Sequence, residues 1–123
     1  MILDKTLDNG LRIIAEKLDN VRTVSVSFTV NAGTVDEQSD EAGISHYIEH
    51  MVFKGTKNRT AAEIAMDMDA VGASLNAGTS RENTRFYAKV LDKHLPTAID
   101  VISDMLLNPK FDSKDMELEK GVV

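Results

Sequence analysis

The 123-residue sequence contains no cysteine. It can therefore form neither a disulfide framework nor a thiolate metal site, and any bound metal must be held by His, Asp or Glu, which suits zinc or manganese. The sequence also lacks a run of about 18 apolar residues that could cross a bilayer, and it does not start with a basic segment followed by a long apolar one. We expect a soluble, cytoplasmic protein, with an organelle protein that has lost its presequence as the alternative.

Blocks of basic residues are absent as well. The chain has 14 Lys and Arg against 20 Asp and Glu, which gives a formal net charge of -6. Because nucleic acids and anionic membranes are bound largely through clustered basic residues, we expect neither as a partner. The content of 42% hydrophobic and 28% charged residues is typical of a folded globular chain, and the length corresponds to one domain or a part of one.

Three segments have the pattern of β-strands and hairpins. Asp8-Asn9-Gly10 predicts an opening hairpin whose two turn positions both have positive φ. Apolar and polar residues alternate from Thr23 to Ala32, which predicts a strand with one face on a core. Residues 74–79 and 84–91 predict a second hairpin, joined by a polar connection at residues 80–83. The sheet should therefore be mostly antiparallel.

Helix signals fill the remaining segments. A helix is predicted over residues 42–53 after a loop rich in acidic residues, and another from the capping box at Thr60 to Gly72. A third starts near Pro96 and ends at Asn108-Pro109. A last helix begins near Asp112 and, because no stop signal follows, should still be running at Val123. These elements predict an α+β fold, and the unfinished last helix indicates a truncated domain.

The segment His46-Tyr47-Ile48-Glu49-His50 carries the strongest chemical signal. Two histidines four residues apart lie on one helical face, close enough to bind one ion, and Glu49 points to the same region. A carboxylate there is suited to take a proton from a zinc-bound water and pass it to a leaving amine. This order, H-x-x-E-H, is the inverzincin signature of zinc peptidases. A chance occurrence in a chain of this length is expected in well under roughly one per cent of cases. The alternative is a solvated helix face that carries two surface histidines.

The residues from Gly43 to Thr56 resemble the signature stretch of the insulinase/pitrilysin family of metallopeptidases, particularly its branch of bacterial processing proteases and mitochondrial processing peptidases. The resemblance extends over essentially the whole chain. It includes residues 8–12, 75–77, 79–82, 86–89 and 102–107. The fold that it implies is part of a metallopeptidase domain of the LuxS/MPP-like type.

The resemblance also implies roles for single residues. His46 and His50 would be zinc ligands, and Glu49 would be the general base. The family's third ligand is a glutamate that would fall just past Val123, so residues 1–123 would be the N-terminal part of the catalytic domain, truncated before that ligand. Glu119 matches a second family carboxylate that supports the site, with a solvated helix glutamate as the alternative.

A substrate-binding edge strand is implied at residues 74–79, where a peptide would add as an extra β-strand beside the metal. Asn76 and Ala77 are the candidate contacts, although Asn76 would also be ordinary at a strand end. Gly78 departs from close relatives, which often have an aromatic or another side chain there, so one substrate contact should be missing.

The implied function is a zinc-dependent endopeptidase that acts on peptides or unfolded proteins. The chain alone should be inactive, because a catalytic zinc site needs three protein ligands and one open position. Its partners would be the substrate, the remaining domains of the full-length peptidase and, through exposed apolar surface, a second copy in a homo-oligomer. The alternative is a non-catalytic partner subunit that binds and presents peptide substrate.

Overall fold

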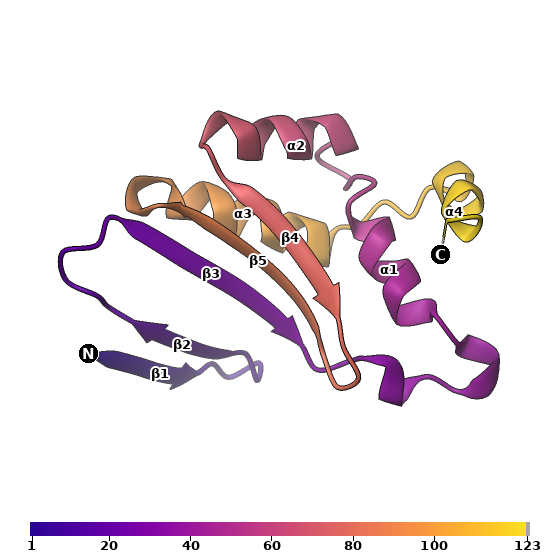
Figure 1. Ribbon diagram of the computed structural model, residues 1–123, viewed down its shortest axis with the longest axis horizontal. Coiled ribbons are helices and arrows are strands. Elements are labelled where there is room, and N and C mark those ends of the chain that lie inside the picture. Colours follow the sequence, from indigo (N-terminus) through magenta and orange to yellow (C-terminus); the bar gives the residue numbers. More distant parts are fainter. Residues whose placement is uncertain (123) are drawn as a thin grey trace.

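The strands of the computed structural model, which describes residues 1–122, form two separate antiparallel sheets. β1 (Ile2–Thr6) pairs with β2 (Arg12–Glu16) as a hairpin. β3 (Thr23–Val30), β5 (Thr84–Leu91) and β4 (Ser74–Thr79) form a three-stranded sheet in the order β3-β5-β4. The predicted strands and their antiparallel arrangement are therefore confirmed. The three-stranded sheet has β4 at one edge (Figure 1).

Four α-helices accompany these sheets in the described part of the chain. They are α1 (Ile44–Val52), α2 (Ala61–Ala70), α3 (Leu95–Leu107) and α4 (Ser113–Lys120). Short 3-10 turns at Thr34–Asp36 and Ser39–Glu41 precede α1, and another at Asp92–His94 leads into α3. The predicted α+β fold is thus confirmed.

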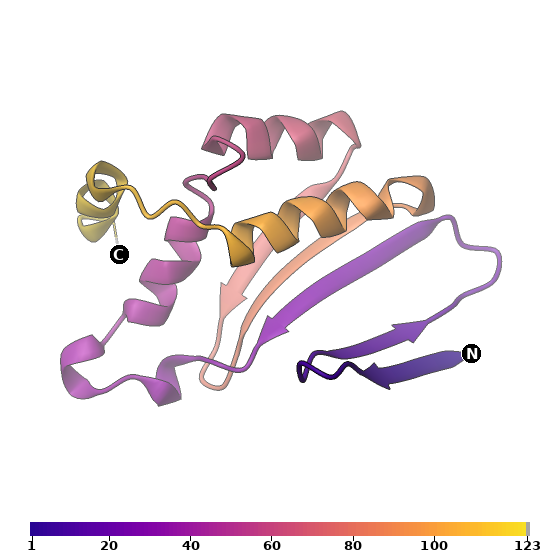
Figure 2. The same ribbon diagram turned by 180° about the vertical axis from the view of Figure 1, so that it is seen from behind.

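The core lies where α3 packs across one face of the three-stranded sheet, as the reverse view shows (Figure 2). Strand β5 alternates buried and exposed residues along its whole length, and α3 contributes residues with no exposed surface, which include Val101, Ile102 and Met105. Helix α2 covers α3 and the start of β4, and its Ile64 and Met68 are also buried. α1 and α4 lie together at the other end of β4 (Figure 1).

Two details of the predicted elements are wrong. In the first hairpin Gly10 has φ +93°, but Asn9 is not in the positive-φ region. Gly10 N donates to Leu7 O at 2.9 Å and Leu7 N to Leu11 O at 2.8 Å, so a turn followed by a left-handed glycine replaces the expected two-residue turn. At the other end, α4 stops at Lys120 and does not run on through Val122. The helix ends with hydrogen bonds between residues three positions apart, from Gly121 N to Leu118 O and from Val122 N to Glu119 O. Such bonds commonly satisfy the last carbonyls of a helix, and glycine is a poor helix former. Val123 lies outside the described residues.

Candidate metal centre

Helix α1 begins where a carboxylate binds its free backbone donors. Glu37 accepts hydrogen bonds from Gly43 N at 3.0 Å and from Ser45 N at 2.7 Å, which hold the pKa of that carboxyl below its ordinary value. One of the predicted acidic residues thus stabilises the positive end of the helix dipole. The helix buries Met51 and Val52 and leaves Ile44 and Ile48 each 43% exposed, so it is partly buried.

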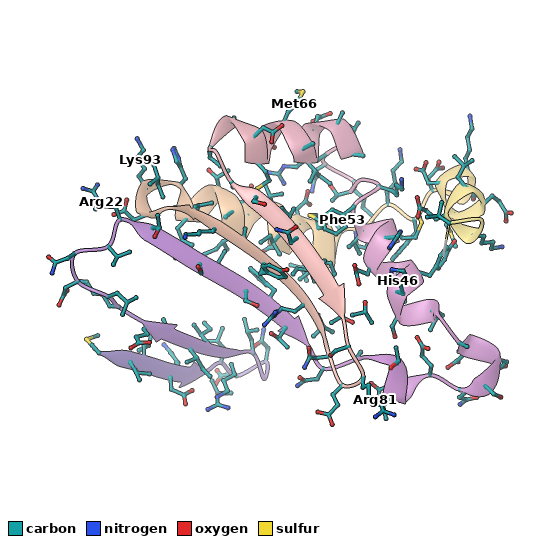
Figure 3. All side chains as sticks on the ribbon, viewed as in Figure 1. Arg22, His46, Phe53, Met66, Arg81 and Lys93 are labelled. Carbon is teal, nitrogen blue, oxygen red and sulfur yellow. The ribbon has the colours of Figure 1, made fainter. Side chains whose placement is uncertain are left out.

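His46, Glu49 and His50 come together on this helix, with one potential ligand atom from each lying within 4.8 Å of the others. The Nε2 atoms of the two histidines are 2.9 Å apart, and their rings meet edge to face. Figure 3 shows His46 on α1, with Phe53 directly after the other end of this helix. The cluster is half-exposed, with His46 open to solvent and the other two side chains partly covered.

This donor set fits a zinc ion. Two imidazole nitrogens that bind one tetrahedral zinc at about 2.0–2.1 Å lie about 3.3 Å apart, close to the observed Nε2 separation. A hydrogen bond between the two nitrogens is the competing explanation for the short distance, and it needs a proton on one of them. Zinc binding requires both Nε2 atoms to be unprotonated, whereas the hydrogen bond requires one protonated and one unprotonated Nε2.

Glu119 of α4 contacts the opposite side of the His50 ring. Its Oε2 lies 3.0 Å from Nδ1 of His50, and its Oε1 lies 2.8 Å from Nζ of Lys54. The side chain of Glu119 is only 8% exposed. The Lys54 ammonium, followed by His50, holds the pKa of Glu119 below its ordinary value, and the hydrogen bond to Glu119 raises the pKa of Lys54. The structure therefore places Glu119 beside His50, whereas the contact with Lys54 was not predicted from the sequence.

The carboxylate of Glu49 has a partner on the edge strand. Thr79, the last residue of β4, donates a hydrogen bond from its hydroxyl to Oε2 of Glu49. Sequence reasoning missed this contact because the two residues are 30 positions apart and nothing in either segment pairs them. Within residues 1–122, Thr79 binds only Oε2, and no hydrogen bond occupies Oε1 of Glu49.

An open cleft of about 330 Å³ lies between this cluster and β4. Its walls include Glu49, His50, Asn76 and Ala77, so the predicted substrate residues and two of the predicted metal-site residues line one space. The remaining walls come from Phe53, Lys54, Leu75 and Glu119.

The backbone of β4 presents hydrogen-bonding groups to its free edge. Ser80 N donates to Asn83 O at 2.8 Å, which marks that pair as hydrogen-bonded. Because bonded and non-bonded pairs alternate in an antiparallel ladder, Ala77 and Thr79 point their N–H and C=O groups away from β5. Asn76 instead pairs with Tyr87 of β5, and its side chain donates to Ser74. No other strand in residues 1–122 pairs with this edge. A side chain at Gly78 would meet open space.

A polar network fixes the chain that follows α1. Asp104 is 6% exposed and accepts hydrogen bonds from four side chains. Thr56, Asn58, Arg59 and Asn108 are the donors. Arg59 also pairs with Asp67 and Asp100, and these carboxylates raise its pKa despite the opposing effect of burial. No pattern in the sequence predicts this network, which connects residues more than 40 positions apart in the chain.

In the described part of the chain, no helix is long and apolar enough to span a membrane.

Comparison with known sequences yields one family and a set of named relatives. Residues 12–123 match the family profile described as insulinase, peptidase family M16. The chain is 44% identical over 123 residues to a Bacillus subtilis protein named "Uncharacterized zinc protease YmxG" and covers 30% of it. It is 47% identical over 118 residues to "Uncharacterized zinc protease ML0855" of Mycobacterium leprae, of which it covers 26%. These alignments include 100% and 96% of this chain.

A eukaryotic relative and a solved structure agree with this result. The chain is 41% identical over 118 residues, 96% of its length, to a probable mitochondrial-processing peptidase subunit beta of Arabidopsis thaliana, of which it covers 22%. The crystal structure of a Helicobacter pylori protease superposes on 99% of the chain with a TM-score of 0.94 and 27% identity, and the chain covers 30% of that structure. The chain therefore spans less than a third of the length of these relatives.

Proposed function

The chain belongs to the insulinase family of peptidases, M16, and from this premise we propose that it is part of a zinc-dependent endopeptidase whose metal centre includes His46 and His50. The observation that carries the proposal is the convergence of both Nε2 atoms and the Glu49 carboxylate in one half-exposed cluster, next to a cleft that Glu49 and His50 line. The names of the relatives as zinc proteases support the choice of metal.

Each residue of the cluster has a distinct part in this proposal. His46 and His50 would hold the zinc ion through Nε2, and Glu119 would keep His50 in the tautomer that has its proton on Nδ1. Bound zinc would supply Lewis-acid polarisation of a peptide carbonyl and of a water molecule. Glu49 would accept the proton of that water at Oε1 and deliver it to the leaving amine, while Thr79 holds Oε2.

The free edge of β4 suits an extended peptide substrate. A peptide that pairs with the outward backbone groups of Ala77 would lie along the cleft that contains Glu49 and His50. Pairing through backbone atoms places few demands on the peptide sequence, which fits a peptidase that acts on varied peptides or unfolded segments. Asn76, whose backbone is used by β5, would contribute through its exposed side chain.

Residues 1–123 supply only two histidine ligands and the base in this proposal, and the third ligand would come from a glutamate that follows them in the full-length protein. The remaining domains would complete the substrate-binding space. A role as a non-catalytic subunit that presents substrate is less well supported, because such a subunit would not need His46, Glu49 and His50 in mutual contact.

Zinc titration by calorimetry tests the metal centre. We expect tight binding by the chain extended past Val123 to restore the next glutamates, weaker binding by residues 1–123, and none by His46→Ala in either form. Equal heats from all of these proteins would contradict a metal site at H-x-x-E-H.

Turnover by the full-length protein tests the assignment of Glu49. Glu49→Gln should retain zinc and lose roughly 10²–10⁴-fold in kcat, because the amide cannot accept the proton. A variant that retains full turnover would instead support the non-catalytic alternative.

A further inference from the structure

Helix α1 and the turn that follows it present three side chains to α4. Tyr47 and His50 are three residues apart on one face of the helix, and Lys54 lies two residues past its end. The Tyr47 hydroxyl donates to the backbone oxygen of Met116 at 2.8 Å, and the other two side chains meet Glu119. These three polar contacts join α1 and the turn after it to α4, in which Glu119 is the buried residue.

The Glu119 carboxylate is oriented by two partners, one for each oxygen. Nδ1 of His50 lies 3.0 Å from Oε2, and the Lys54 ammonium lies 2.8 Å from Oε1. With its side chain only 8% exposed, Glu119 has little access to water that could replace either partner. Removal of Lys54 would leave Oε1 without a donor in a nearly buried position and free the carboxylate to rotate away from the His50 ring.

From these contacts we propose that Lys54 is a positioning residue for the metal centre, which fixes Glu119 so that its carboxylate accepts a hydrogen bond from Nδ1 of His50. That bond places the imidazole proton on Nδ1 and leaves the Nε2 lone pair directed at the site shared with His46. The inference deepens the proposed function and rests on it. Lys54 lies outside the H-x-x-E-H motif and would act on the metal centre through its contact with Glu119 and the contact of Glu119 with His50.

Zinc affinity of the full-length protein, measured by competition with a chromophoric chelator, tests the proposal. Lys54→Met keeps the length of the side chain and removes its charge, and it should weaken zinc binding by about 10–100-fold. Lys54→Arg retains a cation and should recover most of that loss. Lys57→Met is the matched control, since Lys57 is exposed and forms no ion pair within residues 1–122, and it should bind zinc as the parent protein does.

A double-mutant cycle shows whether Lys54 acts through Glu119. Glu119→Gln alone should weaken zinc binding, and the addition of Lys54→Met should cause little further loss. In the metal-free protein, nitrogen chemical shifts of His50 should report a proton on Nδ1, and Lys54→Met should shift the ring toward a mixture of tautomers. This measurement needs no bound metal or turnover.

The outcomes separate this inference from the proposed function. The inference is overturned if Lys54→Met leaves both the zinc affinity and the His50 tautomer unchanged. It is also overturned if the losses of zinc affinity from Lys54→Met and Glu119→Gln simply add, because Lys54 would then form only a surface ion pair. The proposed zinc centre would stand in both cases. If His46→Ala binds zinc as tightly as the parent protein, the proposed function itself fails.

Discussion

At the residue scale, Glu49 depends on a group outside its own helix. The Thr79 hydroxyl holds one oxygen of its carboxylate, and a hydrogen bond to a charged group contributes about 1.5–3 kcal/mol. Thr79→Val keeps the shape of the side chain and removes the donor. In the full-length protein we expect kcat to fall at least roughly tenfold with zinc content unchanged, because the base is no longer held toward the cleft. Steady-state kinetics together with metal analysis would measure both quantities.

Thr79→Ser is the matched control for this prediction. Serine restores the hydroxyl and should recover most of the lost turnover, whereas a purely structural role of the methyl group would leave serine as impaired as valine. Parental kcat in the valine variant would show that Glu49 does not need this contact.

The buried carboxylate of Asp104 predicts a pH dependence of stability. Burial alone would raise its pKa, but hydrogen bonds from Thr56, Asn58, Asn108 and Arg59 outweigh burial and leave the pKa well below its ordinary value of 3.8. The stabilisation is therefore complete above about pH 4 and is lost as the pH falls toward the folded-state pKa. At pH 7, Asp104→Asn should lower the free energy of unfolding by about 3 kcal/mol, and the difference from the parent should shrink in acid.

Denaturant titrations of the full-length protein from pH 7 to pH 2.5 would follow this difference. Asp100→Asn is the control, because Asp100 pairs with the same Arg59 but its side chain is 71% exposed, and such pairs contribute about 0–1 kcal/mol. If the two variants lose equal stability at neutral pH, the network around Asp104 is not the source of the effect.

The residues that the sequence predicted are those whose geometry is local. His46 and His50 share a helical face because they are four positions apart, and Glu49 follows from the same helix. The contacts of Thr79 with Glu49 and of Lys54 with Glu119 depend on how α1 packs against β4 and α4. Such contacts join residues far apart in the chain, and no local pattern encodes them.

At the element scale, strands and helices were predicted well where hydrophobic periodicity and end signals agree. β4 and β5 have the predicted bounds, and α2 starts at the predicted cap, Thr60, whose hydroxyl accepts from Glu63 N at 3.1 Å. The hairpin turn and the end of α4 were wrong, because both depend on a few backbone angles that residue types only bias. The separation of β1 and β2 from the main sheet is a matter of long-range packing, which periodicity does not report.

The edge strand gives the prediction that belongs to this scale. Ala77→Pro removes an N–H that faces the free edge, so it should leave the pairing with β5 largely intact and raise KM for a peptide substrate at least roughly tenfold. Asn76→Pro, one residue earlier, removes an N–H that β5 uses and should lower the melting temperature instead. Peptide kinetics and thermal unfolding of the full-length protein would distinguish these effects. Equal melting temperatures for the two variants, or parental KM in Ala77→Pro, would contradict the assigned edge.

At the scale of the whole molecule, the isolated 123-residue chain should fold but contain an incomplete metal site. Two histidines leave a zinc ion with two positions for other ligands, one more than a catalytic site keeps open. We expect no chelator-sensitive peptide cleavage by the purified chain and measurable cleavage by the full-length protein. Mass spectrometry of quenched reactions would detect the cleaved peptide in each case. Robust cleavage by the short chain, abolished by chelators, would show that the third ligand is dispensable.

The β1–β2 hairpin leads to an expectation about association. It lies apart from the main sheet (Figure 1), and all its strand residues are exposed, with Ile2 at 69% and Ile14 at 62%. Apolar surface of this kind favours self-association of the isolated chain, so sedimentation velocity should show an average mass that rises above 13.5 kDa with concentration. Ile14→Lys should weaken this association, while Ser27→Lys, which adds the same charge at an exposed polar position of β3, should change it little. Because both variants move the net charge from -6 to -5, a difference between them measures the apolar contact and not the change in charge.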